Sequence, residues 1–267
     1  MSDDVGLEAV KAVYNGPEGD LWELIMGHQI HIGGFQSSMD LSERAGIAGT
    51  SHGMDLCCCN GAGMRFLARF RDVQRMTGVD ASSTVIERGK RRCAEEGLGE
   101  RITFVQADVT DSGLPGGCAD FIWSEDAWCY VVDKAALIRE AARLVRPGGT
   151  IAFTDWVLGE TPMSVEESRR YRAFMKFPNV ESLAGYARLL AQNDCSIIEA
   201  EDTGRFSPWL DLYLEMVDKQ FTYDALRILD FDMDMLRTVA GEMMFLKELA
   251  GSGKIAQGRV VARKRPA

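Results

Sequence analysis

Acidic residues lie within or shortly after three short apolar segments in the first half of the sequence. Asp55 lies within residues 53–57, Asp80 follows residues 73–79, and Asp108 closely follows residues 101–106. Such segments are typical of buried parallel strands, whose carboxyl ends meet at one edge of a sheet. A carboxylate in the position of Asp80 can accept hydrogen bonds from both hydroxyls of a ribose. A lone Asp after a strand is more often a turn or cap residue, but the ordered set favours a nucleoside cofactor site.

The loop after the first strand separates two kinds of nucleoside cofactor. A dinucleotide fingerprint has the form G-x-G-x-x-G, with glycines where the backbone approaches the pyrophosphate. Residues 55–63 read Asp-Leu-Cys-Cys-Cys-Asn-Gly-Ala-Gly, so cysteines occupy the phosphate-cradling positions. Side chains there narrow the cavity and require backbone angles that non-glycine residues can reach. We interpret the loop as a variant that still binds its cofactor, and a loop that has lost its ligand is the alternative.

Strand and helix signals alternate along the chain and predict an α/β fold. A helix with one apolar face is expected over residues 134–145, ended by Arg146-Pro147-Gly148-Gly149, and a capping box at Ser164 and Glu167 begins another. This alternation predicts a parallel sheet with helices on both faces and ligands over the carboxyl ends of its strands. Strands are expected at residues 53–57, 73–79, 101–106, 119–124, 150–155, 196–201 and 258–263.

Composition argues against several classes of partner. The net charge is −10 and no run of Lys and Arg is dense enough to follow a phosphate backbone, so neither nucleic acid nor a membrane surface is expected. Residues 1–4 lack the basic and apolar regions of a signal peptide, and the seven cysteines are an odd number, so we expect a reducing, cytoplasmic location. Adjacent Cys57, Cys58 and Cys59 do not have metal-ligand spacing, and no metal is expected.

Several short motifs resemble one enzyme family. Residues 55–61 resemble motif I, D-x-G-x-G-x-G, of the class I S-adenosylmethionine methyltransferases, from which the cysteines depart. Asp108-Val109 resembles the family's adenine-binding position, and residues 144–149 resemble its L-x-P-G-G turn. Residues 27–33, Gly-His-Gln-Ile-His-Ile-Gly, are similar to the lid of the phosphoethanolamine and the sarcosine/dimethylglycine N-methyltransferases. Similarity to this group extends over nearly the whole chain and includes residues 121–127, 151–155 and 253–258.

The resemblance implies a Rossmann-like fold, a seven-stranded, mostly parallel sheet with helices on both faces. It implies an amino-terminal lid over residues 1–45, a cofactor-binding core over 46–160 and a helical substrate cap over 161–195. Residues 196–267 would complete the core around a helical insertion at 209–250. The apolar residues of that insertion have helical spacing and are interpreted as ordinary core or as a subunit contact, which leaves a homodimer open.

The resemblance also implies S-adenosylmethionine as the cofactor, with S-adenosylhomocysteine as its product. Tyr14 and Trp22 would close over the cofactor, and Ile30 and His31 would lie near its methionine part. The complete set of predicted cofactor contacts is Trp22, Ile30, His31, Asp55, Cys57, Asn60, Gly61, Asp80, Ala81, Asp108, Val109, Ser124 and Glu125.

Methyl transfer from a sulfonium is an in-line displacement, so the protein chiefly has to align the reactants and exclude water. Tyr14, His31 and Asp126 are the predicted catalytic residues, with Asp126 as the acceptor for the proton of an amine. The predicted substrate contacts are Trp128, Tyr130, Trp156, Tyr171 and Arg172.

Two departures from the family narrow the acceptor. Tyr130 and Met175 stand where the phosphoethanolamine enzymes carry a histidine and a phosphate-binding arginine, so a phosphate ester is not expected. Arg169, Arg170 and Arg172 could bind a carboxylate, although such a cluster is usually a solvated helix face. The predicted function is therefore N-methylation of a small amine related to glycine, sarcosine or dimethylglycine. The alternatives are a methyltransferase acting on carbon, oxygen or sulfur, and a non-catalytic relative.

Overall fold

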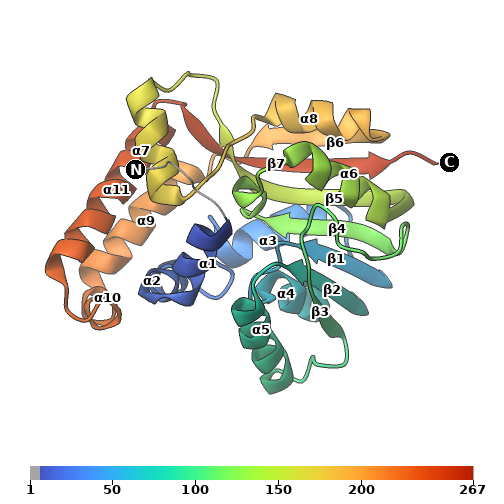
Figure 1. The fold of residues 1–267 in the computed structure, drawn as a ribbon, viewed down its shortest axis with the longest axis horizontal. Coiled ribbons are helices and arrows are strands. Elements are labelled where there is room, and N and C mark those ends of the chain that lie inside the picture. Colours follow the sequence, from blue (N-terminus) through green and yellow to red (C-terminus); the bar gives the residue numbers. More distant parts are fainter. Residues whose placement is uncertain (1–6, 267) are drawn as a thin grey trace.

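Seven strands form one sheet in the computed structural model, which describes residues 7–266 (Figure 1). Their order is β3-β2-β1-β4-β5-β7-β6; β1 to β5 pair in parallel, and β7 is antiparallel to both of its neighbours. The predicted fold class is confirmed, although residues 1–4, which carried the prediction about a signal peptide, lie outside the described residues. The strands are β1 (His52–Leu56), β2 (Arg75–Asp80), β3 (Ile102–Gln106), β4 (Ala119–Glu125), β5 (Val145–Leu158), β6 (Cys195–Asp202) and β7 (Ile255–Lys264).

Helices cover both faces of the sheet because its central strands are apolar on both sides. On one face lie α3 (Gly34–Arg44), α4 (Ala62–Phe70) and α5 (Ser83–Glu95), and their core includes Leu41, Leu67 and Cys93. On the other face lie α6 (Lys134–Leu144) and α8 (Leu183–Gln192), which bury Leu137 and Tyr186. Helix α8, which ends the segment 161–195 expected as a substrate cap, packs on β6 and β7 and covers the sheet.

A separate group of helices lies beyond the carboxyl ends of the parallel strands, at the left of Figure 1. It has a core of its own, to which Leu21, Leu210 and Leu246 contribute. Residues 209–250, which were interpreted from the sequence as core or as a subunit contact, thus contribute to the core of this lobe. Its helices are α1 (Leu7–Asn15), α2 (Pro17–Met26), α7 (Val165–Met175), α9 (Phe206–Lys219), α10 (Thr222–Ile228) and α11 (Met233–Gly251).

Local sequence signals determine where several of the helices begin or end. The capping box is present, because Ser164 Oγ accepts from the Glu167 N–H at 3.2 Å and the Glu167 carboxylate accepts from the Ser164 N–H at 2.8 Å. Helix α6 ends at Leu144 as expected, but β5 already begins at Val145, because Val145 pairs with Ala119 before an irregularity in the register. Within residues 7–266 no helix is long and apolar enough to cross a membrane.

Candidate functional site

The turn after β1 is held against β2 at the carboxyl edge of the sheet. The backbone N–H groups of Cys57 and Cys58 both donate to the Val79 carbonyl, at 2.9 and 3.1 Å. Cys57 and Cys59 have φ angles of 67° and 47°, a left-handed conformation that non-glycine residues seldom adopt. The cysteines therefore occupy the glycine-like backbone positions of the turn and place their side chains beside two cavities.

The first cavity, here the strand-end cavity, lies over the ends of β2 and β3. Asp80 accepts from the Ser82 N–H through one carboxylate oxygen and from the Cys59 N–H through the other, both at 2.9 Å. Burial raises the pKa of Asp80, and these N–H groups oppose the rise. Each oxygen keeps a lone pair for a further donor, as two ribose hydroxyls would require. The lining residues are Leu7, Cys57, Asp80, Ala81, Asp108, Val109, Thr110, Tyr130, Val131, Val132 and Asp133.

The second cavity, here the loop cavity, is lined by three carboxyl groups, those of Asp55, Glu125 and Asp126. Within residues 7–266 no donor reaches the Asp55 carboxylate, and burial together with the nearby charge of Glu125 raises the pKa of Asp55 well above its usual range. Glu125 accepts from Ser38 at 2.7 Å and from the Trp123 ring N–H at 3.1 Å. A Cβ at Gly63 would come within 3.4 Å of the Asp55 and Glu125 carboxylates.

An amide completes the polar wall of the loop cavity. Asn60 is buried and donates to the His28 carbonyl at 3.2 Å, whereas its side-chain oxygen has no partner within the described residues. A cationic group with N–H donors would satisfy this oxygen and the Asp55 and Glu125 carboxylates together. The lining residues are Tyr14, His28, Gln29, Ile30, Asp55, Cys57, Cys58, Cys59, Asn60, Ala62, Gly63, Glu125, Asp126 and Ala127.

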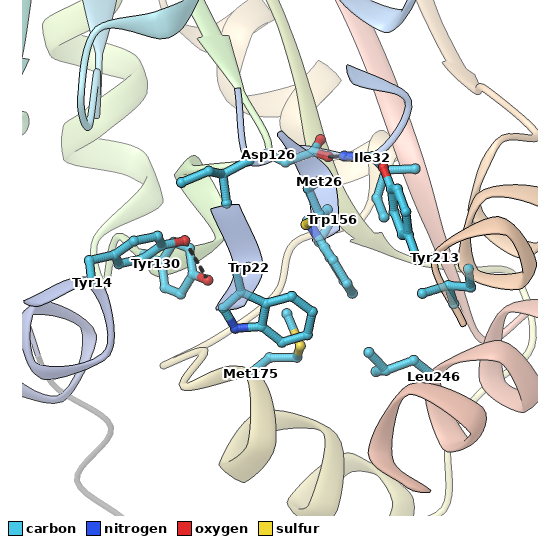
Figure 2. Close-up of a pocket in the computed structure, with 12 residues that line it drawn as sticks. Tyr14, Trp22, Met26, Ile32, Asp126, Tyr130, Trp156, Met175, Tyr213 and Leu246 are labelled. Atoms are coloured by element: carbon cyan, nitrogen blue, oxygen red, sulfur yellow. Dashed lines mark hydrogen bonds between the residues drawn. The ribbon is translucent and has the colours of Figure 1, made fainter. Parts of the chain in front are cut away.

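The helical lobe encloses a third space, here the aromatic chamber (Figure 2). Tyr14 and Tyr130 join at one side through a hydroxyl–hydroxyl hydrogen bond of 3.2 Å. Burial raises the pKa of both phenols above their usual value, so they are neutral at physiological pH. The chamber holds about 30 Å³, room for one water molecule. Its lining residues are Tyr14, Trp22, Met26, Ile30, Ile32, Asp126, Tyr130, Trp156, Met175, Leu210, Tyr213 and Leu246.

The aromatic chamber and the loop cavity share part of their walls. Tyr14, Ile30 and Asp126 line both spaces, and Cys57 lines both the loop cavity and the strand-end cavity. A ligand bound along the two cavities would therefore reach the wall of the chamber. This arrangement suits the transfer of a small group from an elongated nucleoside to a molecule in the chamber.

Asp126 fastens the lid segment to the sheet. Its carboxylate accepts from the Ile32 N–H at 2.8 Å and from the Gln257 amide at 2.9 and 3.1 Å (Figure 2 shows the Ile32 bond). The same amide donates to the Ile32 carbonyl at 2.9 Å. Burial raises the pKa of Asp126, and His31 and these donors oppose the rise. Three N–H contacts leave this carboxylate better suited to positioning the lid than to accepting a substrate proton.

Most of the predicted site residues do come together. Asp80, Ala81, Asp108 and Val109 line the strand-end cavity. Tyr130 and Trp156, two of the predicted substrate contacts, line the chamber, and so does Trp22, which had been expected beside the cofactor. The predicted residues that line the loop cavity are Tyr14, Ile30, Asp55, Cys57, Asn60, Glu125 and Asp126.

Three residues predicted to contact the cofactor line none of these spaces. His31 is buried and lies 3.2 Å from Glu125, so it acts on the cavity through neighbouring carboxyl groups and not by lining it. Gly61 begins α4, with a φ of 73° that suits glycine. The buried Ser124 hydroxyl donates to the Leu56 carbonyl.

Three predicted substrate contacts are placed elsewhere by the structure. Trp128 is fully buried, and its ring N–H donates to the Leu56 carbonyl. Tyr171 is also buried and packs on Trp156 from outside the chamber. Arg172 donates to the carbonyl groups of residues 177 and 178. These side chains support the walls of the site and are not brought to its interior.

Sequence reasoning missed part of the chamber and its clamp. Gln257 lies in the matched segment 253–258, but one polar residue in a strand does not reveal what it will bond. Leu210, Tyr213 and Leu246 lie in the apolar segment 209–249, but their spacing cannot separate a chamber wall from ordinary core. Within residues 7–266 no group of three or more His, Cys, Asp or Glu side chains is arranged to hold a metal ion.

Comparisons with known proteins agree with this geometry. Residues 54–153 match the family model described as a methyltransferase domain. The chain is 30% identical over 156 residues to 27-O-demethylrifamycin SV methyltransferase of Amycolatopsis mediterranei, covering 58% of this chain and 57% of that protein. It is 27% identical over 168 residues to the sarcosine/dimethylglycine N-methyltransferase of Halorhodospira halochloris, covering 57% and 60%. The chain spans about half the length of the curated relatives it matches.

A solved structure shows the same fold over the whole chain. Phosphoethanolamine N-methyltransferase 2 of Haemonchus contortus, in complex with S-adenosylmethionine, superposes with a TM-score of 0.86 at 18% identity, covering 100% of this chain and 60% of that one. The strand order and the position of the cavities define a class I methyltransferase fold. The chain therefore has the class I methyltransferase fold, and its residues 54–153 match a methyltransferase domain, in agreement with the family that its motifs resemble.

Proposed function

We propose that the protein binds S-adenosylmethionine along the two cavities and transfers its methyl group to the nitrogen of a small amine in the aromatic chamber. The observation that carries the proposal is the shared wall of Tyr14, Ile30 and Asp126 between the chamber and the loop cavity. The cofactor supplies a methyl group activated by its sulfonium. The residues of the chain have to position the amine and exclude water.

The polar groups around the cavities match the parts of this cofactor. The partnerless Asp55 carboxylate and Asn60 oxygen suit a cationic methionine end, the Asp80 carboxylate suits ribose hydroxyls, and Val109 offers an apolar surface to a purine ring. Cys57 lies between these groups and lines both cavities. A thiol there takes space but leaves both ends of the site accessible.

The chamber supports an amine as the acceptor because it contains no free base. Tyr14 and Tyr130 are neutral and bonded to each other, and the Asp126 carboxylate already accepts several N–H groups. A neutral amine carries its own lone pair and needs no proton removed before the displacement. Its cationic product would be favoured by the Asp126 charge and by the surrounding aromatic faces.

The test is an assay of S-adenosylhomocysteine release with matched amines, phenols and thiols. The proposal expects turnover of amines, with a rate that rises with pH as the neutral amine becomes more abundant. Turnover of phenols or thiols without any turnover of amines would remove the assignment to nitrogen. Failure of every acceptor, together with no binding of the cofactor, would remove the enzymatic function.

A further inference from the structure

The aromatic chamber has no positive charge in its wall. All twelve lining residues are described, and none is Lys, Arg or His. Its aromatic rings come from Tyr14, Trp22, Tyr130, Trp156 and Tyr213, and the only ionisable carboxyl group is that of Asp126. A bound acceptor therefore meets aromatic faces, apolar side chains and one fixed negative charge.

Three arginines of α7 precede the chamber residue Met175 in the sequence, and all three contact other groups. Arg170 pairs with Glu242 at 3.1 Å and stacks over the Phe245 ring at 4.0 Å. Arg172 donates to carbonyl groups of the loop after α7, and Arg169 pairs with Glu166 at 2.6 Å. None of the three lines the chamber, so a negatively charged group bound there would meet no cation among the twelve lining residues.

An unpaired anion is costly in such a chamber. A carboxylate or phosphate would leave water without gaining a charged partner, and Asp126 would repel it. An ammonium group meets the opposite conditions, because the rings and Asp126 both attract a cation. Met26 and Met175 can rearrange to admit apolar groups larger than the closed space.

We propose that the acceptor is an amine on an uncharged apolar body, and that amines carrying a carboxylate or phosphate are excluded. This inference rests on the proposed function and replaces the glycine-like acceptor predicted from sequence. A substitution at Met175 should change this exclusion of negatively charged amines. It is the last residue of α7, it lines the chamber, and it is only partly buried, so a long cationic side chain fits there.

Calorimetric binding of phenylalanine and phenylalaninamide tests the inference, because the two differ in charge but hardly in size. Titrations are done with and without S-adenosylhomocysteine. The wild-type protein should bind phenylalaninamide at least tenfold more tightly, and phenethylamine should bind like the amide. Met175→Arg should reduce the advantage of the amide by tenfold or more, whereas Met175→Leu should retain it.

Equal affinity for the two compounds, tighter binding of phenylalanine, or no binding of either uncharged-body amine at millimolar concentration would overturn the inference. Should Met175→Arg not fold, the comparison in the wild-type protein still decides. Binding is measured without methyl transfer, so the two proposals can fail separately. A protein that binds the amide but never methylates it would retain this inference and lose the proposed activity.

Discussion

At the scale of single residues, we predict that the Cys57 side chain limits the passage between the strand-end cavity and the loop cavity. It lines both cavities and has a φ of 67°, where a glycine would be free of strain. The sequence indicated this position, because cysteine replaces a glycine of the family motif. It could not show that the turn keeps its glycine-like conformation, since that depends on the bonds from the Cys57 and Cys58 N–H groups to Val79.

A size series at Cys57 measures this control. Cys57→Gly removes strain and bulk, so the affinity for S-adenosylmethionine should rise by up to roughly tenfold. Cys57→Leu overfills the passage and should weaken binding by about tenfold or more. Calorimetry gives both values, and Cys118→Leu, at the opposite edge of the sheet just before β4, is the matched control. Tight binding by Cys57→Leu would show that the cofactor does not pass this side chain.

The clamp formed by Asp126 and Gln257 gives a second prediction. If Asp126 accepts the substrate proton, Asp126→Asn should lower turnover and Gln257→Leu should leave it unchanged. If Asp126 instead positions the lid, both substitutions weaken or remove a hydrogen bond to the Ile32 backbone. Both should then lower kcat by about tenfold or more. Both should also weaken cofactor binding, because Ile30 lines the loop cavity.

Three measurements decide between these roles of Asp126: kcat, cofactor affinity and amide hydrogen exchange over residues 27–33. Faster exchange in both variants supports the clamp. Wild-type kcat and exchange in Gln257→Leu would contradict it.

At the scale of elements, the lid is anchored unevenly. Asp40 on α3 bonds to Arg205 at 2.8 Å and also pairs with Arg259 on β7, whereas no residue of α1 is fully buried. We therefore predict that α1 opens most readily, whereas α3 stays on the sheet. The sequence indicated a lid over residues 1–45, but only the packing separates its fixed part from its movable part.

Hydrogen exchange followed by mass spectrometry tests this division of the lid. S-adenosylhomocysteine should slow exchange in α1 and α2 by tenfold or more and leave α3 little changed. The local stability of a segment reflects its buried contacts, and α1 has no fully buried residue. Equal protection of all three helices without ligand would contradict the prediction.

Asp155 connects β5 to α8 and to the segment after β4, and it should make the stability of the fold depend on pH. Asp155 accepts from the Cys129 N–H at 3.0 Å and from the Tyr186 hydroxyl at 2.6 Å, and burial raises its pKa to about 6 from 3.8. The folded state thus holds a proton that the unfolded state has lost. The resulting stabilisation is present below about pH 4 and is lost as the pH rises through about 6.

Chemical denaturation of the wild-type protein and Asp155→Asn between pH 4 and pH 7 measures this effect. The wild-type free energy of unfolding should fall relative to that of the variant by about 2 kcal/mol over this range, because one pKa unit corresponds to about 1.4 kcal/mol and part of the effect lies below pH 4. The exposed Asp218→Asn is the control for the loss of one carboxylate. Parallel profiles for the wild-type protein and Asp155→Asn would contradict the assignment.

At the scale of the whole molecule, the sequence predicted the sheet better than the chamber. Strand spacing and the carboxylates after the strands place the cofactor cavities, because the carboxyl ends of parallel strands always meet. The chamber is assembled from α2, α7, α9 and α11, which are distant in the sequence. Whether an aromatic residue points inward or supports the wall, as Trp156 and Trp128 do, depends on that assembly.

Calorimetric titration of S-adenosylmethionine into the wild-type protein and Asp80→Asn tests the central claim most directly. We predict saturable binding to the wild-type protein with a Kd below about 100 µM. Asp80→Asn should bind roughly ten- to a hundredfold more weakly, because a charged acceptor of hydroxyl hydrogen bonds is lost. No binding to the wild-type protein at millimolar concentration, or equal affinity in the two proteins, would contradict the account.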